Sequence, residues 1–132
     1  MANAKRLKQL SFSMANKAGL LSEVATAISN AKVNINSICA YESENIAYFK
    51  LTMDSPAKAK KALAKLKIWA TEDDLVAVEM PNKVGQLQKV AKKISDAGLN
   101  ISYVYGTTGT GRSSICMLKT SDNRTAIREI NK

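Results

Sequence analysis

Hydrophobic residues near the start of the chain follow first the period of a strand and then that of a helix. Leu10, Phe12 and Met14 alternate with serines, which is the pattern of a half-buried strand. After a turn at residues 15–19, apolar residues recur at helical spacing over residues 21–31. The opening of the chain therefore predicts a strand followed by an amphipathic helix.

The segments that follow predict a hairpin, a second helix and a short last strand. Residues 33–41 and 46–53 are rich in β-branched and aromatic residues, which indicates the two strands of a hairpin. Ser55 can cap a helix whose first position is Pro56, where a missing N–H costs least. The remaining expected elements of this half are a helix at 57–67, a strand at 68–71 and a turn at 72–74.

The second half of the chain repeats the first. Residues 14–35 and 80–101 align without a gap at an offset of 66, and 12 of the 22 positions are identical. Because this period covers half the chain, it indicates a duplication of one unit and not a solenoid of short repeats. The identical pairs are Met14/Met80, Asn16/Asn82, Lys17/Lys83, Gly19/Gly85, Leu21/Leu87, Val24/Val90, Ala25/Ala91, Ile28/Ile94, Ser29/Ser95, Ala31/Ala97, Asn34/Asn100 and Ile35/Ile101.

The repeated pattern predicts an α+β protein made of two ferredoxin-like units, residues 1–72 and 73–132. Each unit reads as βαββαβ, an antiparallel sheet with both helices on one face. Gly98 suits the position just after the end of a helix. The elements expected in the second unit are a strand at 75–80, a helix at 84–97, strands at 99–105 and 112–120, and a helix at 122–131.

The second unit is expected to lack its last strand. Under the repeat, with one extra hairpin residue counted, Lys132 falls opposite Lys65, so nothing corresponds to residues 66–71. Either the sequence stops one strand early, or the first strand of this unit, Leu75–Met80, has an open edge. An open edge could pair with a partner.

Charge and residue chemistry narrow the possible functions. The net charge of +9 could indicate nucleic acid, but residues 1–66 carry 10 basic and 4 acidic groups, and residues 67–132 carry 10 and 7. The excess is therefore spread over the chain. The densest basic run falls on a predicted helix at spacings that suit a solvated face, so we do not expect nucleic acid as a partner. This run consists of Lys58, Lys60, Lys61 and Lys65.

Cysteine and histidine content argues against an enzyme or a metal protein. The chain has no histidine, which excludes any triad with a histidine base, and two cysteines are too few for a zinc site. Cys39 and Cys116 lie in apolar stretches and are expected to be free, buried thiols. We expect no catalytic residue, no metal and no cofactor. Without a signal-like or membrane-spanning segment, a cytoplasmic location is expected.

The loops that precede the two repeated helices resemble those of the ACT domain family. The resemblance covers essentially the whole chain, as in small stand-alone tandem ACT proteins of bacteria. It implies a non-catalytic regulatory module that binds an amino acid at the seam between units, acts on a regulated enzyme or regulator, and forms a homodimer. The motifs are Asn-x-x-Gly at 16–19 and 82–85, and Lys-Val-Asn-Ile at 32–35 with Gly-Leu-Asn-Ile at 98–101.

The resemblance also implies which residues contact the ligand. In the ACT domain of phosphoglycerate dehydrogenase, a loop Asn and the Asn that opens the second strand hold the amino acid. The ligand positions implied here are Asn16, Lys17, Ala18, Gly19, Leu20 and Asn34 in the first unit, and Asn82, Lys83, Val84, Gly85, Gln86, Leu87 and Asn100 in the second.

Two departures from the family affect the expected ligand. Ala18 and Val84 stand where the family commonly has proline before the glycine. Met14 and Met80 stand where the phosphoglycerate dehydrogenase module has a ligand-contacting histidine. Methionine makes the pocket more apolar, so a ligand with an apolar side chain is favoured over a serine-type one.

The same residues also allow other interpretations of the loops and of the function of the chain. Asn16 and Asn82 could serve as helix N-caps. The glycine-rich stretch 106–111 lies between two strands with no helix after it, so it predicts a hairpin and not a phosphate loop. Two other functions are an RNA-binding ferredoxin-like module and a ligand-free assembly module that uses the open edge of the second unit.

Overall fold

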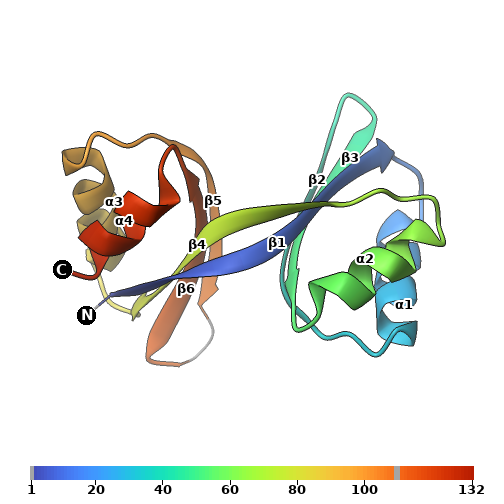
Figure 1. The fold of residues 1–132 in the computed structure, drawn as a ribbon, viewed down its shortest axis with the longest axis horizontal. Coiled ribbons are helices and arrows are strands. Elements are labelled where there is room, and N and C mark those ends of the chain that lie inside the picture. Colours follow the sequence, from blue (N-terminus) through green and yellow to red (C-terminus); the bar gives the residue numbers. More distant parts are fainter. Residues whose placement is uncertain (1, 109–110) are drawn as a thin grey trace. The chain divides into compact units, whose positions relative to one another are not determined.

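The computed structural model describes residues 2–108 and 111–132, and the chain folds into two compact units. One unit comprises residues 8–73. The other comprises residues 74–132 together with the N-terminal segment up to Leu7. Each unit has a sheet with two helices on one of its faces (Figure 1). The α+β class and the two ferredoxin-like units predicted from the repeat are confirmed.

The first unit follows the predicted order of elements. Its strand order is β2-β3-β1-β4, with antiparallel pairing of β2 to β3 and of β3 to β1. The elements are β1 (Asn3–Ala15), α1 (Leu20–Asn30), β2 (Ile35–Ser43), β3 (Ile46–Met53), α2 (Pro56–Ala64) and the beginning of β4 (Thr71–Pro81). Ser55 caps α2 as expected, because its hydroxyl accepts the Lys58 N–H at 3.4 Å.

The second unit has the same arrangement in the order β5-β6-β4-β1. Its fourth strand is not a segment after the last helix but the first residues of β1, residues 3–7. The other elements are the main part of β4, α3 (Gln86–Asp96), β5 (Ile101–Thr108), β6 (Ser113–Thr120) and α4 (Asn123–Ile130). In the predicted glycine-rich hairpin, residues 109–110 lie outside the described residues.

Residues 3–7 close the sheet of the second unit. Ala4 is 3% exposed and belongs to the same buried cluster as Val76 and Val78 of β4. Asn131 holds this strand: its Oδ1 accepts the Ala4 N–H at 2.7 Å, and its Nδ2 donates to the Ala4 carbonyl at 2.9 Å. Among the described residues no strand comes after α4, in line with the repeat. The expected open edge on Leu75–Met80 is wrong, because β1 lies beside β4.

The connection between the two repeats also differs from the prediction. β4 starts at Thr71 and continues without interruption to Pro81, so the expected turn at residues 72–74 is wrong. Residues 68–70 form no strand, but Ile68 and Ala70 are buried in the core of the first unit. The apolar residues at these positions therefore indicate burial in the core and not pairing as a β-strand.

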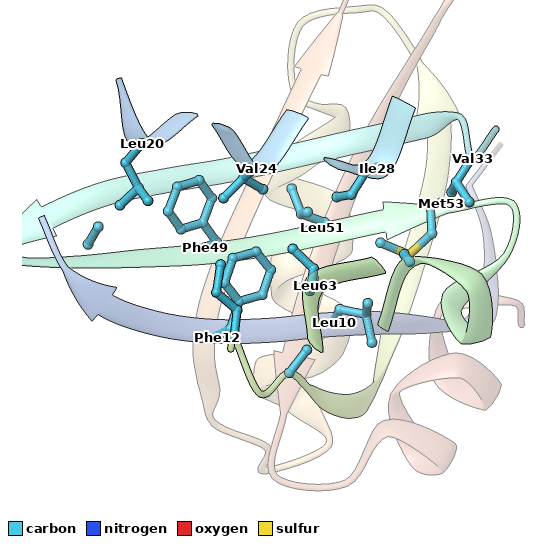
Figure 2. Packing of buried hydrophobic residues seen from close by; sticks show 14 residues of the cluster. Leu10, Phe12, Leu20, Val24, Ile28, Val33, Phe49, Leu51, Met53 and Leu63 are labelled. Atoms are coloured by element: carbon cyan, nitrogen blue, oxygen red, sulfur yellow. The ribbon is translucent and has the colours of Figure 1, made fainter. Parts of the chain in front are cut away.

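The core of the first unit lies between the sheet and its two helices (Figure 2). Phe12 of β1 and Phe49 of β3 stack with ring centroids 5.0 Å apart, and Val24 of α1 and Leu63 of α2 are buried in the same cluster. Each such buried side chain contributes roughly 1.5–3 kcal/mol to folding. Alternate residues of β3 are buried, and these form the face of the strand that packs against the helices. The predicted bounds of this strand, 46–53, are confirmed.

Candidate functional site

The two loops that open α1 and α3 have the same backbone geometry. Each helix begins after a glycine in the left-handed region, Gly19 at φ 82° and Gly85 at φ 86°. This conformation favours glycine, because other residues meet steric strain there. Glycine has no side chain to accept from the N–H groups of the first helical turn, so neither Asn16 nor Asn82 is an N-cap. The N-cap interpretation of these asparagines is wrong.

Both loop asparagines are anchored through their backbone to the hairpin of their own unit. The Asn16 N–H donates to the Asn45 carbonyl at 2.8 Å, and the Asn82 N–H donates to the Arg112 carbonyl at 2.7 Å. The pairs occupy equivalent positions of the repeat. The structure therefore holds each loop in place while the Asn side chain stays exposed.

The Asn82 side chain is held more firmly than that of Asn16. Its Oδ1 accepts from the Ser114 hydroxyl at 3.3 Å, and its Nδ2 lies 3.5 Å from the Gly111 carbonyl. Ala47 stands at the position equivalent to Ser114 and offers no hydroxyl. The second loop is thus the more preorganised of the two.

The strand-opening asparagines lie far from the loops within each unit. Asn34 pairs with Asp54 at the end of β3, donating its N–H to Oδ1 at 3.2 Å, whereas Asn16 pairs with Asn45 at the start of β3. These contacts are at opposite ends of the nine-residue β2. Such a strand spans roughly 26 Å at about 3.3 Å per residue. One unit alone therefore does not bring Asn16 and Asn34 to the same small ligand.

Asn100 occupies the corresponding place in the second unit. Its N–H donates to the Ser121 hydroxyl at 3.1 Å, and its carbonyl accepts the Ser121 N–H at 3.0 Å. Ser121 follows β6, so Asn100 also lies at the end of its unit opposite the loop that holds Asn82.

A cavity opens beside each loop, between the start of the helix and the hairpin. In the first unit it measures about 310 Å³ and in the second about 440 Å³; Asn82 itself lines a neighbouring cavity of about 680 Å³. The first is lined by Asn16, Lys17, Gly19, Leu20, Leu21, Ser22, Ala40, Tyr41, Glu42, Ala47 and Phe49. The second is lined by Met80, Pro81, Lys83, Gln86, Leu87, Val104, Tyr105, Gly106, Ser114, Ile115 and Cys116.

Two aligned positions on the hairpin walls carry smaller side chains in the second unit. Ala40 pairs with Phe49 in the first unit, and Gly106 pairs with Cys116 in the second. Each exchange replaces a larger side chain by a smaller one. Burial raises the pKa of the Cys116 thiol, so this wall stays neutral and apolar.

The charge around the two loops also differs. Lys17 forms an ion pair with Glu23 at 3.1 Å in the first turn of α1. The residue equivalent to Glu23 is Lys89, and the first turn of α3 contains no acidic residue. The second loop, which carries Lys83, therefore has the more positive surroundings.

The other implied ligand positions divide by exposure. Leu20 is 5% exposed and packs in the core at the wall of the first cavity. Ala18 is exposed, and Val84 points fully into solvent. Gln86 and Leu87 line the second cavity.

Hairpin residues at the cavities were missed by the sequence analysis. Gly106 and Cys116 belong to β5 and β6, beyond the stretch in which the repeats align closely. The only sequence signal is the change from Ala40 and Phe49 to smaller residues at equivalent positions.

A further cavity of about 500 Å³ lies between α1 and α2, away from the loops. It is lined largely by α1 residues and by small side chains such as Ala27, Ala31 and Ala62. At the position of Ala27 the second unit has Lys93, whose Nζ donates to the Ile130 carbonyl at 3.0 Å. This cavity contains none of the loop residues and is not the candidate site.

Three general features of the described part of the chain bear on function. No group of three or more His, Cys, Asp or Glu side chains in that part is arranged to hold a metal ion. No helix among the described residues is long and apolar enough to cross a membrane. Neither cysteine forms a disulfide; Cys116 is buried, and Cys39 is half-buried where the sequence predicted a buried thiol.

Comparisons with known proteins agree with this architecture. The protein BT0572 from Bacteroides thetaiotaomicron superposes with a TM-score of 0.89 at 28% identity, covering 98% of this chain and 89% of that one. The ligand-free regulatory subunit of aspartate kinase from Thermus thermophilus gives a TM-score of 0.68 at 14% identity, with coverage of 98% and 94%. Aspartokinase alpha and beta subunits give 0.67 at 13% identity, with coverage of 98% and 95%.

The sequence itself identifies the family. Comparison with curated proteins gives no match. The family described as an ACT domain pair matches residues 5–131, which is nearly the whole chain. Members of this family bind amino acids and regulate enzymes. This chain therefore belongs to the ACT domain pair family.

Proposed function

We propose that this ACT domain pair is a non-catalytic regulatory sensor that binds a free amino acid at its loops. The observation that carries the proposal is the pairing of a glycine-started helix with a cavity at its side, present in both units. The helix start supplies N–H groups for a carboxylate, and the cavity supplies an apolar place for a side chain. An α-amino acid has both parts.

The helix start is suited to a carboxylate for two reasons. N–H groups at a helix start lie at the positive end of its dipole. The first N–H of each helix, on Leu20 and Gln86, donates to the Lys17 or Lys83 carbonyl at 3.3 Å, so the N–H groups that follow it are the ones placed to meet a carboxylate. Gly19 and Gly85 leave open space on their Cβ side, so the carboxylate can approach the backbone. The exposed amides of Asn16 and Asn82 can accept from the ligand's ammonium group.

A neighbouring unit is needed to complete the contacts. β2 is an edge strand, and antiparallel pairing with the β2 of a second copy places the start of one strand beside the end of the other. Asn34 of one copy then approaches the loop that holds Asn16 in the other. Ile38 is 46% exposed on this edge, an apolar side chain that such pairing would bury. The same holds for Val104 on the β5 edge, which is 49% exposed. We therefore propose a homodimer with the amino acid at the seam.

Thermal unfolding of the full chain with each of the twenty amino acids tests this function. A ligand at a hundred times its Kd adds about 2.7 kcal/mol to the free energy of unfolding. We expect stabilisation by one or a few apolar amino acids and none by the rest. The proposal fails if no amino acid raises the melting temperature at millimolar concentration.

Substitution at the loop locates the site. Asn82→Ala should abolish the shift produced by the stabilising amino acid, because the amide is lost while the fold is kept. Asn30→Ala, on the exposed end of α1, is the control and should leave the shift unchanged. Retention of the full shift in Asn82→Ala would contradict the assignment of the loop.

A further inference from the structure

We propose that the second unit carries the principal ligand site and that Cys116 and Gly106 make it selective for amino acids with long or aromatic apolar side chains. This inference rests on the proposed function, since it concerns the same kind of loop site. It follows from differences between two aligned sites in one chain.

The first difference is the space available for a side chain. The cavity beside the first loop measures about 310 Å³, and the cavity beside the second measures about 440 Å³. In the first unit the ring of Phe49 occupies the wall and stacks on Phe12. In the second unit the equivalent pair is Cys116 with Val78, which face each other across β6 and β4. The smaller pair leaves the additional volume.

Gly106 lines this cavity on the edge strand and allows β5 to lie close to β6. A Cβ at this position would lie 2.6 Å from the Ile115 carbonyl oxygen and 2.9 Å from the Cβ of Cys116. Such distances are not tolerated, so the close approach of β5 to β6 here depends on glycine. The equivalent residue in the first unit is Ala40. The cavity wall at Gly106 is therefore bare backbone.

The rest of the cavity is mainly apolar. Met80 is 5% exposed and contributes from the end of β4. Leu87 and Val104 also line the cavity, and they are 55% and 49% exposed. Because Leu87 and Val104 expose so much apolar surface at the rim, contact with a large apolar side chain of the ligand would remove more of that surface from water than contact with a small one. A leucine, methionine or phenylalanine side chain fits this wall better than that of alanine or serine.

The second difference is charge at the point where the carboxylate would bind. Lys17 is engaged by Glu23 at 3.1 Å in the first unit. In the second unit Lys83 and Lys89 occupy the two equivalent positions, and both are cations. A carboxylate at the start of α3 therefore meets two positive charges, whereas one at α1 meets a lysine already paired with a carboxylate.

Calorimetric titration of the full chain with alanine, valine, leucine and phenylalanine tests the inference. Cys116→Phe restores the ring found in the first unit and should weaken binding of the larger amino acids at least about tenfold, the usual effect of a pocket that is too small. Ser95→Phe, which adds the same ring to an exposed residue near the end of α3 away from the loop, is the control and should leave binding unchanged.

A second pair of variants keeps the test decisive if Cys116→Phe does not fold. Lys83→Gln and Lys17→Gln both change exposed residues at equivalent positions. We expect Lys83→Gln to weaken binding severalfold and Lys17→Gln to have no effect. Equal loss in both variants, or full binding of phenylalanine by folded Cys116→Phe, would overturn this inference while leaving the proposed function intact. Absence of binding to the unmodified chain would overturn both.

Discussion

The two units reach the same four-stranded sheet by different connections. In the first unit the chain runs from α2 directly into β4, so the fourth strand is covalently tied to the helix before it. In the second unit the fourth strand is residues 3–7, which lie at the other end of the chain from α4. The second unit replaces this connection by burial of Ala4 and by the two hydrogen bonds of Asn131. A repeated sequence can therefore specify the same fold without specifying the same connectivity.

The largest effect is expected from a charge placed at the centre of the N-terminal strand. Ala4→Glu would bury an unpaired carboxylate in the core of the second unit, where Ala4 is 3% exposed. Because an unpaired buried charge is strongly unfavourable, we expect a loss of about 3 kcal/mol in the free energy of unfolding. Denaturant unfolding gives this value, and amide hydrogen exchange shows which unit opens.

Lys5→Glu is the control for Ala4→Glu, because Lys5 is exposed on the neighbouring position of the same strand. It should change the stability by less than about 0.5 kcal/mol, as is usual for surface substitutions. If Ala4→Glu were equally mild, or if the first unit lost protection before the second, the role assigned to residues 3–7 would be wrong.

Loss of the Asn131 side chain should have the next largest effect. Asn131→Ala removes both hydrogen bonds to Ala4 and leaves its backbone groups without these partners. This costs about 1–3 kcal/mol for groups that stay partly buried. The equivalent position in the first unit is Ala64. There the chain itself joins α2 to β4, so no side-chain hydrogen bond is needed to hold the fourth strand. Denaturation of Asn131→Ala and of the control Ala64→Asn should show a clear loss only in the former.

Much of the fold could be predicted from the sequence, because the elements have strong local signals. The strand-forming residues at 46–53, the Ser55 cap and the Gly98 helix end all reflect preferences set within a few residues. The N-terminal strand could not be predicted in the same way. Residues 2–8 contain charged side chains such as Lys5 and Arg6 and only one buried residue, Ala4, so they show no strand pattern. Their pairing partner, β4, is about seventy positions away in the sequence.

The candidate site shows the same limit. The loops with Asn16 and Asn82 could be found because the repeat preserves residue identity there. The cavity walls could not, because Gly106 and Cys116 act through the volume they leave empty, which appears only when β5 and β6 are paired. The failed N-cap interpretation has a local cause: Gly19 and Gly85 start the helices three residues later.

The two units also differ at the residue that follows the C-cap of their first helix. Gly98 adopts φ 75°, and the equivalent Lys32 adopts φ 62°, in the left-handed region that disfavours side chains. Gly98→Ala should destabilise the second unit by about 1 kcal/mol, and Lys32→Gly should stabilise the first by a similar or smaller amount. Melting curves of the two single variants test both signs. Shifts in the same direction would contradict the comparison.

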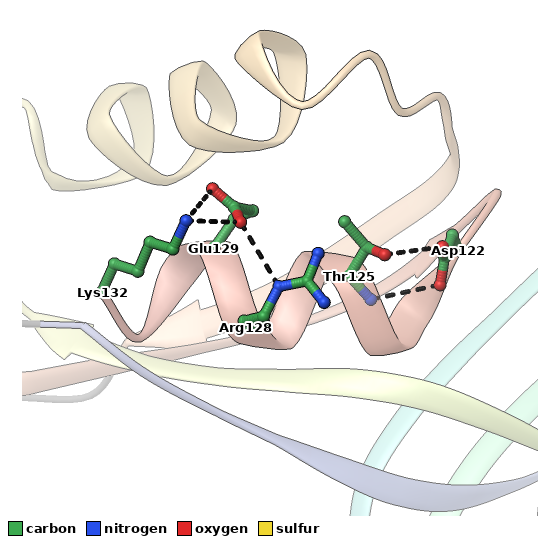
Figure 3. A network of polar contacts seen from close by, with 5 residues as sticks. All are labelled: Asp122, Thr125, Arg128, Glu129 and Lys132. Atoms are coloured by element: carbon green, nitrogen blue, oxygen red, sulfur yellow. Dashed lines mark hydrogen bonds and ion pairs between the residues drawn. The ribbon is translucent and has the colours of Figure 1, made fainter.

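The smallest expected effect is a difference in acid sensitivity between the N-caps of α2 and α4, the last helix of each unit. Asp122 caps α4: its Oδ1 accepts the Thr125 N–H at 3.1 Å, and its Oδ2 accepts the Thr125 hydroxyl at 2.6 Å (Figure 3). The hydrogen bond from the Thr125 side chain, followed by that from its backbone, lowers the pKa of the Asp122 carboxyl. Ser55 caps α2 with a hydroxyl that does not titrate in this range.

These two caps should respond differently to acid. Since the folded-state pKa of Asp122 is lowered, its contribution is complete above the unfolded-state value of about 3.9 and is lost as the pH falls through the folded-state pKa. Glu129 lies on the same helix, and the pKa of its carboxyl is also lowered, chiefly by its hydrogen bond with Lys132. Asp122→Ser therefore isolates the cap: below about pH 4 its stability should fall less steeply than that of the unmodified chain. Unfolding measured from pH 6 to pH 2 gives the two slopes, and identical slopes would mean that the Asp122 cap does not contribute to the difference between the units.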